Sequence, residues 1–166
     1  PDGEAGEIQL QGPSRMAGYF ADARATRAAI TGDGFFKTGD LGVMEGDGQF
    51  TFLARMGDVL RLSGFLVSPA EIEHHIQAHA MVNGCQVVGV DTDAGPRAVG
   101  FVTLAPGADF DEKTLIRHCR RHLARYKTPA RIMALEAFPV TRSANGTKIQ
   151  RVRLREMAMS EIRGKT

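Results

Sequence analysis

The chain of 166 residues is 43% hydrophobic and 24% charged, and its formal net charge is only +2. This length and apolar content predict a folded protein with one domain or two small ones. A balance so close to neutral gives no global basic field for nucleic acid, and no apolar run approaches the roughly 18 residues of a membrane span. We therefore expect neither a nucleic-acid partner nor a membrane span.

The two cysteines, Cys85 and Cys119, lack the paired spacing of a disulfide framework or a zinc motif. Together with the lack of a signal-peptide pattern, this favours a reduced, cytoplasmic protein. The sequence begins at Pro1 rather than at a methionine. We therefore expect it to be a piece of a longer protein.

The amino-terminal third of the sequence is expected to be mostly β, because its apolar residues alternate with polar ones between turn residues. The expected elements are a strand over 7–10, a helix over 21–30 with Asp22 as its N-cap, strands over 35–38 and 41–44, and a hairpin strand over 50–54 after a Gly-Asp-Gly turn.

After Arg55 the pattern changes to one of mixed helices and strands. Ser68, Pro69 and Glu71 form the signature of a helix start: an N-cap, a proline at the first helical position and a capping box. The expected elements are short apolar pieces over 59–62 and 65–67, a helix to about residue 80, strands over 86–90 and 98–104, a helix over 111–124, a strand over 132–135 and a helical tail over 149–162.

These elements predict an α+β fold in two parts. Residues 1–55 would be mostly β, and residues 56–166 would combine helices with strands.

Asp40 follows a glycine and stands between two expected strands. A carboxylate at a strand end can accept hydrogen bonds from vicinal hydroxyls, as an acidic residue does when it holds a nucleotide ribose. A plain turn closed by an Asx bond explains the same sequence.

The junction between the two parts carries Arg55, Gly57, Arg61 and Gly64. A glycine at a junction absorbs large backbone changes, so Gly57 is a candidate hinge, with a passive linker as the alternative. Gly64 has no side chain, so a thin ligand could approach the strand surface closely at this position. Arg61 faces that surface, or it is a solvated strand arginine.

Histidines recur at helical spacing in two places, as His75 and His79 and as His118 and His122 beside Cys119. Such pairs can bind transition metals, but a site needs third and fourth ligands. Neither helix has an obvious carboxylate partner at the right spacing to supply them. We therefore expect no metal.

Lys148 lies in the Ser, Asn and Gly-rich segment 143–151, which is expected to be a mobile loop. A lysine there can swing into a cleft and neutralise a phosphate or carboxylate in a transition state. An ordinary surface lysine is the alternative.

Four segments follow one another along nearly the whole chain: GEIQLQGPSRMAGYF, FFKTGDLG, ARMGDVLRLSGFLVSPAEIE and PVTRSANGTKIQR. Together they resemble the consecutive C-terminal motifs of the adenylate-forming (AMP-binding) acyl-CoA synthetase superfamily. The resemblance implies an acid-CoA ligase in which ATP, with Mg²⁺, activates a carboxylic acid as an acyl-adenylate. The thiol of coenzyme A then displaces AMP. The resemblance also implies that residues 1–55 are the end of the β-rich subdomain of the large domain and that residues 56–166 are a small mobile domain in which helices flank an antiparallel sheet.

By position, the resemblance implies that Asp40 binds the ribose hydroxyls of ATP and that Arg55 contacts the same region. Gly57 would be the hinge about which the C-terminal domain rotates between the two half-reactions. Arg61 matches a basic position of the thioester-forming state, and Gly64 sits where the backbone approaches the pantetheine arm. Lys148 matches the lysine that assists adenylation.

Two positions depart from the family pattern. Gly57 stands where Asp or Lys is usual, and six residues separate Thr141 from Lys148 where the family has a shorter spacing. The family's phosphate loop and acyl pocket have no counterpart in this sequence. We therefore expect the chain alone to be inactive, with the N-terminal domain of the same enzyme as its partner.

Two other functions stay open. One is an adenylation domain that serves a carrier protein; CoA is preferred because no carrier module follows Arg163 and GFLVSPAEIE resembles the CoA-ligase form of its motif. The other is a non-catalytic, stand-alone binding module. The acid substrate is not identified by these residues.

Overall fold

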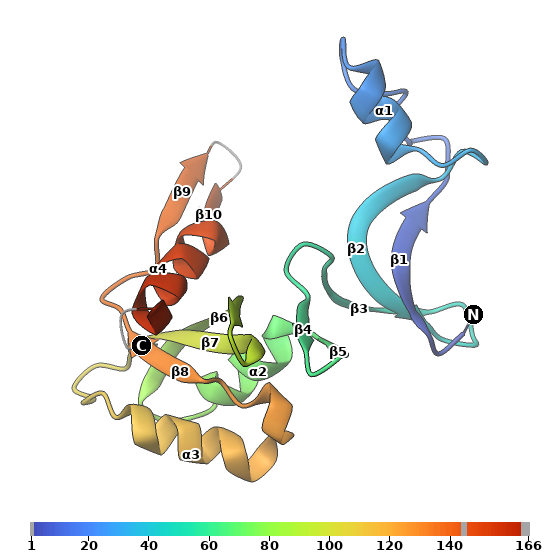
Figure 1. Cartoon of the computed structure of the whole chain (residues 1–166). Helices are drawn as coiled ribbons and strands as arrows, with labels where there is room; N and C mark the ends of the chain where they lie inside the picture. Colours follow the sequence, from blue (N-terminus) through green and yellow to red (C-terminus); the bar gives the residue numbers. More distant parts are fainter. Residues whose placement is uncertain (1, 144–145, 164–166) are drawn as a thin grey trace. The chain divides into compact units, whose positions relative to one another are not determined.

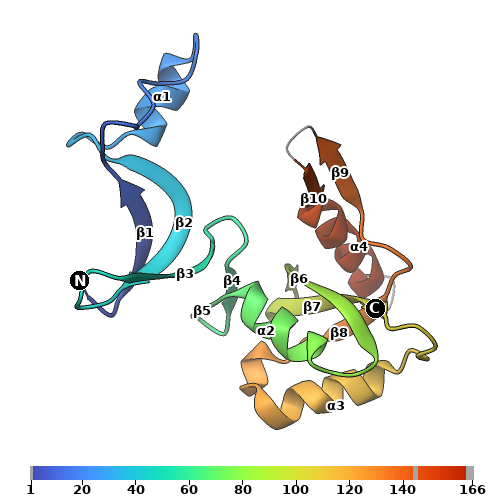
Figure 2. The same cartoon turned by 180° about the vertical axis from the view of Figure 1, so that it is seen from behind.

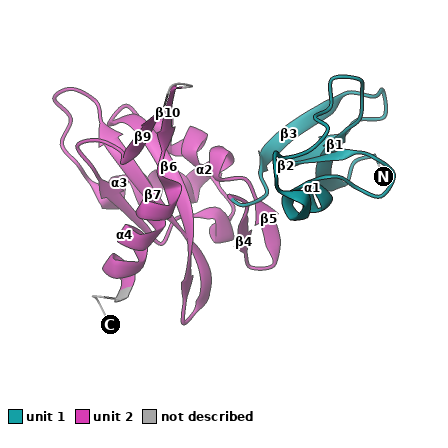
Figure 3. Ribbon diagram, turned by 90° about the horizontal axis from the view of Figure 1, so that it is seen from above, with its two compact units in different colours: residues 1–57 teal, residues 58–166 magenta. Residues whose placement is uncertain are grey.

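The computed structural model describes residues 2–143 and 146–163. The chain divides into two compact units, Pro1–Gly57 and Asp58–Thr166, coloured teal and magenta in Figure 3. Each unit has its own sheets and is described by itself below.

The first unit is a three-stranded antiparallel sheet with one short helix. Its strands β1 (Ala5–Leu10), β2 (Phe36–Met44) and β3 (Phe50–Arg55) lie in the order β1-β2-β3, and α1 (Ala23–Ala29) connects β1 to β2 (Figure 1). The carboxylate of Asp22 accepts a hydrogen bond of 2.8 Å from the backbone N–H of Ala25, which confirms Asp22 as the N-cap.

Residues 36–44 form one strand where the sequence predicts two. Gly39 has a φ of +72°, and the pairing of β2 with β3 shifts between Leu41 and Gly42. The glycine and the bulge let the chain bend locally without leaving the sheet. Asp40 therefore lies within a strand rather than between two strands.

The first unit leaves much apolar surface uncovered. Among its described residues, the buried hydrophobic ones are Leu41 and Ala54. Phe50 and Phe52 are more than half exposed, and their spacing puts both on one face of β3. Its exposed large hydrophobic residues are Leu10, Tyr19, Phe20, Met44, Phe50, Phe52 and Met56. Large apolar side chains left exposed in this number often mark an interface.

The second unit contains the remaining helices and strands. They are β4 (Leu60–Leu62), β5 (Phe65–Val67), α2 (Pro69–Gln77), β6 (Val82–Thr92), β7 (Gly95–Leu104), α3 (Glu112–His122), a 3-10 turn (Arg125–Lys127), β8 (Arg131–Ala134), β9 (Val140–Ser143), β10 (Gly146–Ile149) and α4 (Arg151–Arg163).

The sheet β6-β7-β8 is covered on both faces, by α2 and α3 on one side and by α4 on the other (Figures 1 and 2). Alternation along the strands separates the two cores, since Val87 packs with α2 and α3 whereas its neighbour Val88 packs with α4. Ile72 and Phe101, one from each core, are fully buried. This unit thus encloses its own hydrophobic core.

The predicted α+β class is confirmed, with one difference in the sheet. Strands β6 and β7 are antiparallel, but β8 pairs with β7 in parallel. Helix α3 lies between β7 and β8 in the chain and returns it to the same end of the sheet, which makes the pair parallel. Helix α2 starts at Pro69 as predicted, although the side chain of Ser68 makes no capping hydrogen bond.

The segment predicted to be a loop around Lys148 forms a hairpin instead. Strands β9 and β10 pair antiparallel, with Lys148 opposite Thr141 and Thr147 opposite Arg142. The side chain of Gln150 donates hydrogen bonds to the Val140 carbonyl and to the Thr141 hydroxyl, which ties the end of β10 back to β9. Residues 144–145 of this segment lie outside the described part of the chain.

Strands β4 and β5 form a tight hairpin whose two turn residues, Ser63 and Gly64, have φ values of 52° and 86°. A two-residue turn with positive φ at both positions matches the right-handed twist of the strands it joins. Glycine adopts this conformation without strain, whereas other L-residues adopt it rarely.

Replacing Gly64 with Ala should lower the free energy of unfolding of the second unit by about 1–2 kcal/mol, because the added Cβ is strained at this φ although nothing lies within 4 Å of it. Gly57→Ala is the matched control, since its Cβ also meets nothing within 4 Å and its φ is not positive. Urea unfolding followed by circular dichroism measures both. A loss for Gly57→Ala as large as for Gly64→Ala would contradict this explanation.

Candidate functional site

Asp40 on β2 and Arg55 on β3 are cross-strand partners. The Arg55 Nη1 atom lies 2.9 Å from Asp40 Oδ1 and donates a hydrogen bond of 3.1 Å to the Thr38 carbonyl. The hydroxyl of Thr38 in turn accepts from the backbone N–H of Asp40. The strand pairing therefore brings together two residues that are 15 positions apart in the sequence.

The Oδ1 atom of Asp40 is buried and accepts no hydrogen bond from any described residue. Its contact with Arg55 is short but is not aligned as a hydrogen bond, so the pair is held by charge. A buried carboxylate oxygen without a hydrogen bond is unusual, and a ligand hydroxyl is a chemically suitable donor. The arrangement can accept the vicinal hydroxyls of a ribose.

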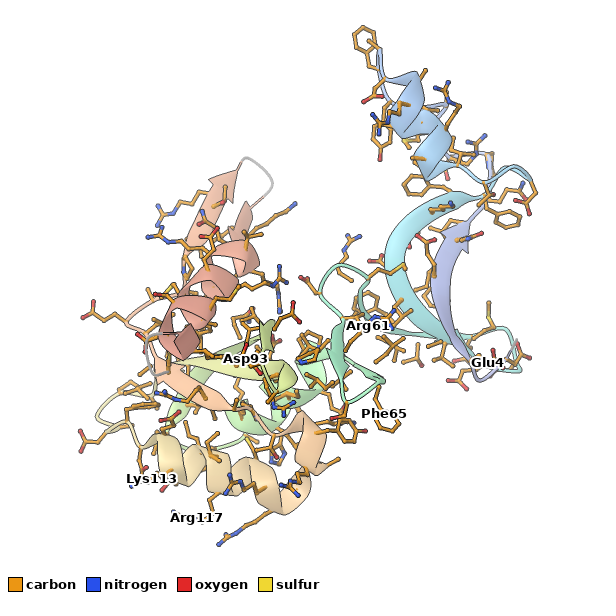
Figure 4. The ribbon with its side chains drawn as sticks, viewed as in Figure 1. Glu4, Arg61, Phe65, Asp93, Lys113 and Arg117 are labelled. Atoms are coloured by element: carbon orange, nitrogen blue, oxygen red, sulfur yellow. The ribbon has the colours of Figure 1, made fainter. Side chains whose placement is uncertain are left out.

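The β4–β5 hairpin carries two further candidate residues, Arg61, which Figure 4 labels, and Gly64. Arg61 is exposed in the middle of β4, opposite Leu66. Gly64 lies in the turn, and Phe65, the next residue, stacks on Tyr126 with ring centroids 4.8 Å apart. The stack fixes the hairpin against the segment that follows α3.

A cleft of about 940 Å³ adjoins this hairpin. Ser63 of the turn lines it together with three arginines, Arg97, Arg120 and Arg125, and with Tyr126. Nearby, the hydroxyl oxygen of Thr128 is buried and has no hydrogen-bond partner among the described residues. Three guanidinium groups beside an aromatic ring suit a ligand that carries phosphates and a flat ring system.

Sequence reasoning missed this cleft. The basic run from Arg117 to Lys127 resembles the solvated face of a helix. Tyr126 inside that run was the available signal, because an aromatic residue among arginines is a common element of nucleotide sites. The contribution of Arg97 comes from β7 and depends on the fold.

Lys148 is exposed on β10. The hairpin is anchored by two residues that follow Lys148 in the chain. Gln150 donates a hydrogen bond to the Thr141 hydroxyl on β9, and Arg151 is the first residue of α4. Arg151 donates hydrogen bonds to Glu73 at 2.9 Å and to the Val87 carbonyl at 3.0 Å, and its Nε atom lies 3.7 Å from an Asp58 carboxylate oxygen. Lys148 is therefore carried by a hairpin whose base is fixed to the body of the second unit.

The structure brings some of the predicted residues together and separates others. Asp40 and Arg55 are partners in the first unit, which ends at Gly57. Arg61, Gly64 and Lys148 belong to the second unit, where the first two share a hairpin beside the arginine-lined cleft and Lys148 occupies another.

Neither cysteine is suited to nucleophilic chemistry. Both are buried free thiols. Burial raises the pKa of the Cys85 thiol far above its ordinary value and raises the pKa of Cys119 to about 11. Because both thiols are protonated at neutral pH, they act as packing residues.

No metal site was predicted from the sequence, because ligands were looked for within one helix at a time. The structure groups His75 from α2 with His118 and His122 from α3, with one ring nitrogen of each within 4.8 Å of the others. The helical spacing was visible in the sequence, but the pairing of the two helices was not.

The described helices include none long and apolar enough to cross a membrane. The family model of the AMP-binding enzyme C-terminal domain matches residues 71–145. Residues 71–145 of this chain are therefore similar to the AMP-binding enzyme C-terminal domain. The match lies within the second unit and covers α2, the central sheet and α3.

Comparison with individual proteins extends the similarity to nearly the whole chain. Sulfoacetate--CoA ligase from Cupriavidus necator is 39% identical over 93% of this chain and 30% of its own length. The crystal structure of ATP-bound MatB from Rhodopseudomonas palustris superimposes with a TM-score of 0.85 at 33% identity, over 95% of this chain and 31% of that one.

A third relative is named for a different activity. The amide bond synthetase McbA from Marinactinospora thermotolerans matches with a TM-score of 0.82 at 31% identity, over 95% of this chain and 31% of that one. The chain thus spans about three tenths of the length of these relatives. They share its fold, but their acceptors are not all the same.

Proposed function

We propose that the protein to which this chain belongs is an AMP-forming acid-CoA ligase. Residues 1–55 would be the end of the large adenylation domain, and residues 56–166 the small domain that rotates about Gly57. The C-terminal domain family and the CoA ligase relative support the reaction class. The observation on this chain that carries the proposal is the buried oxygen of Asp40, which lacks a hydrogen-bond donor and lies beside Arg55.

In the first step, a carboxylate oxygen of the acid attacks the α-phosphorus of ATP, and pyrophosphate leaves. Asp40 holds the ribose hydroxyls, and Arg55 orients the Asp40 carboxylate by its charge. Lys148 places its ammonium group near the acid and the α-phosphate, where negative charge develops in the transition state. Positioning and charge stabilisation are what phosphoryl chemistry demands of a protein.

In the second step, the sulfur of CoA attacks the acyl carbon, the acyl–phosphate bond breaks, and AMP leaves. The arginine-lined cleft favours CoA over a carrier protein, because CoA carries a nucleotide and three phosphate groups whereas a carrier-bound pantetheine lacks the nucleotide. Ser63 connects this cleft to the turn at Gly64, along which the pantetheine arm would run, past Arg61.

Mg²⁺ enters this proposal as the partner of ATP. Among the described residues, the only grouping of three potential ligands consists of histidines, which are poor ligands for Mg²⁺. Oxygen ligands for the ion would come from ATP and from the rest of the enzyme. We propose the cytoplasm as the compartment, which the two free cysteines support.

The N-terminal domain of the same enzyme is the proposed partner of the first unit. The chain spans 30% of its CoA ligase relative, and the exposed aromatic residues Phe50 and Phe52 offer an apolar surface. Covering that surface with the remainder of the adenylation domain would complete a core that the first unit lacks.

The complete enzyme should consume ATP in the presence of its acid and CoA and release AMP and pyrophosphate rather than ADP and phosphate. A panel of carboxylic acids assayed for acid-dependent exchange of pyrophosphate into ATP, followed by mass spectrometry of thioester products, tests this directly. Release of ADP, or no exchange with any acid, would overturn the proposal.

Arg120→Ala and Arg125→Ala should each raise the KM for CoA on the order of 10-fold and leave pyrophosphate exchange unchanged, because each removes one charged contact to a phosphate. Arg121→Ala is the matched control, since Arg121 is exposed on the same helix and does not line the cleft. Equal KM values for all three variants would place CoA elsewhere. Loss of exchange in the cleft variants would indicate a structural effect instead.

The amide bond synthetase McbA gives a reason to test the acceptor separately from adenylation. If exchange occurs but CoA yields no thioester, a carrier protein or an amine becomes the acceptor to test. If the protein binds a partner or CoA without exchanging pyrophosphate, the non-catalytic binding module is the better description.

A further inference from the structure

We propose that His75, His118 and His122 form a binding site for one divalent transition-metal ion, with Zn²⁺ as the best-suited probe. The three side chains lie where α2 packs against α3, in the second unit. They belong to none of the residues assigned above to ATP, CoA or the hinge. The site is therefore additional to the proposed ligase function and independent of it.

The histidines are gathered by helix packing rather than by chance exposure. His75 and His118 are partly buried, and their rings stack with centroids 4.4 Å apart. The ring of His122 lies 5.1 Å from that of His75 and 5.5 Å from that of His118. His122 follows His118 by one helical turn, so both project from the same side of α3.

Backbone contacts fix which ring nitrogens can bind an ion. The Nε2 atoms of His75 and His118 each face the other residue's backbone carbonyl, at 3.4 and 3.1 Å, and Nδ1 of His122 faces the carbonyl of His118 at 3.3 Å. A carbonyl only accepts, so each of these nitrogens carries the hydrogen. The lone pairs are left on Nδ1 of His75 and His118 and on Nε2 of His122, and such backbone partners are typical of metal-binding histidines.

The ligand set determines the kind of ion. Three neutral imidazoles suit Zn²⁺, Cu²⁺, Ni²⁺ and Co²⁺, whereas Mg²⁺ and Ca²⁺ require oxygen ligands. The group contains no carboxylate. Water would occupy the fourth position, as in zinc sites with three protein ligands.

Binding requires a small contraction of the group. One ring nitrogen of each histidine lies within 4.8 Å of one ring nitrogen of the other two, whereas zinc–nitrogen bonds of about 2.0–2.1 Å in a tetrahedron bring the ligand nitrogens to roughly 3.4 Å. His122 is exposed and His118 partly buried, so rotation of these side chains can close the gap without moving the buried face of α3. The bound ion would then join α2 to α3.

Isothermal titration of the untagged 166-residue chain with ZnCl₂ is the first test; a polyhistidine tag would itself bind the ion. We expect one ion per chain and a rise in the melting temperature of several degrees. His122→Asn and His118→Asn should each weaken Zn²⁺ binding on the order of 100-fold, because losing a ligand has at least the effect of losing an outer-shell partner. MgCl₂ should produce neither effect.

His74→Asn is the matched control, because His74 is exposed on the same helix, next to His75, and lies outside the group. Long-range proton–nitrogen correlation spectra of the wild-type rings provide a readout that needs no variant. Zn²⁺ should shift the ring nitrogens of His75, His118 and His122 and leave those of His74 unchanged. No saturable binding, equal weakening by His74→Asn, or shifts confined to other histidines would each overturn the proposal.

Discussion

Replacing Lys148 with Ala in the complete enzyme should slow acyl-adenylate formation on the order of 100- to 1,000-fold, the usual effect of removing one group that stabilises transition-state charge. Thioester formation from supplied acyl-adenylate and CoA should be nearly unchanged, because the α-phosphate displacement is already complete. Acid-dependent pyrophosphate exchange measures the first step, and rapid-quench thioester formation measures the second.

Arg142→Ala provides the control for Lys148. Both side chains are basic and exposed on the β9–β10 hairpin, but Lys148 pairs with Thr141 and Arg142 with Thr147, so the two point to opposite faces. We expect Arg142→Ala to retain both half-reactions. If Lys148→Ala impaired the two steps equally, or if Arg142→Ala matched it, the assigned role of Lys148 would be wrong.

Replacing Arg151 with Ala should lower the free energy of unfolding of the second unit by about 2 kcal/mol, since hydrogen bonds to charged groups contribute roughly 1.5–3 kcal/mol. The change removes the bonds to Glu73 and to the Val87 carbonyl and the ionic contact with Asp58. The side chain of Glu73 is only 13% exposed, so its carboxylate keeps little water in compensation. Glu73 would keep the hydrogen bond of 2.9 Å that its carboxylate accepts from the backbone N–H of Val87.

The measurement is urea unfolding of the chain, with hydrogen exchange of α4 to locate the loss in the second unit. Arg153 is an exposed arginine two residues further along α4, and Arg153→Ala should keep the free energy of unfolding within about 0.5 kcal/mol of wild type. Arg151→Lys should fall between the two, because lysine keeps the charge but cannot make the forked contact. Equal losses for Arg151→Ala and Arg153→Ala would show that the contacts at the start of α4 do not stabilise the unit.

In the complete enzyme, Arg151→Ala should also slow adenylation more than it slows thioester formation from supplied adenylate. Arg151 does not touch the reacting groups in our proposal; it positions Lys148 by fixing the base of its hairpin. This effect should be smaller than that of Lys148→Ala. An unchanged ratio of the two half-reactions would contradict the positioning role.

Local signals predicted the elements whose causes are local. The N-cap at Asp22 and the helix start at Pro69 depend on residues within one turn, and both are confirmed. The β9–β10 hairpin was missed because Thr141, Arg142, Thr147 and Lys148 are all polar and give no alternation. Its pairing is reinforced by Gln150, a contact that no strand pattern reveals.

The remaining differences arise from tertiary structure. The parallel direction of β8 depends on the path of α3, and the arginine-lined cleft needs Arg97 from β7 beside Arg120 from α3. The histidine group likewise requires two helices to pack. For the candidate ATP and hinge residues, the sequence motifs specified the positions, whereas the unbonded oxygen of Asp40 could be found only from the strand register.

The contact between Arg151 and Asp58 has a consequence for protein engineering. The second unit encloses its core on both faces of the sheet, so it is suited to transplantation between related proteins as a single segment. In a chimera joined after Asp58, the transplanted unit would lack the acidic partner of Arg151, because the residue at that position would come from the recipient protein. A junction at Gly57 keeps that pair together, and chimeras joined there should retain more of the donor's thermal stability.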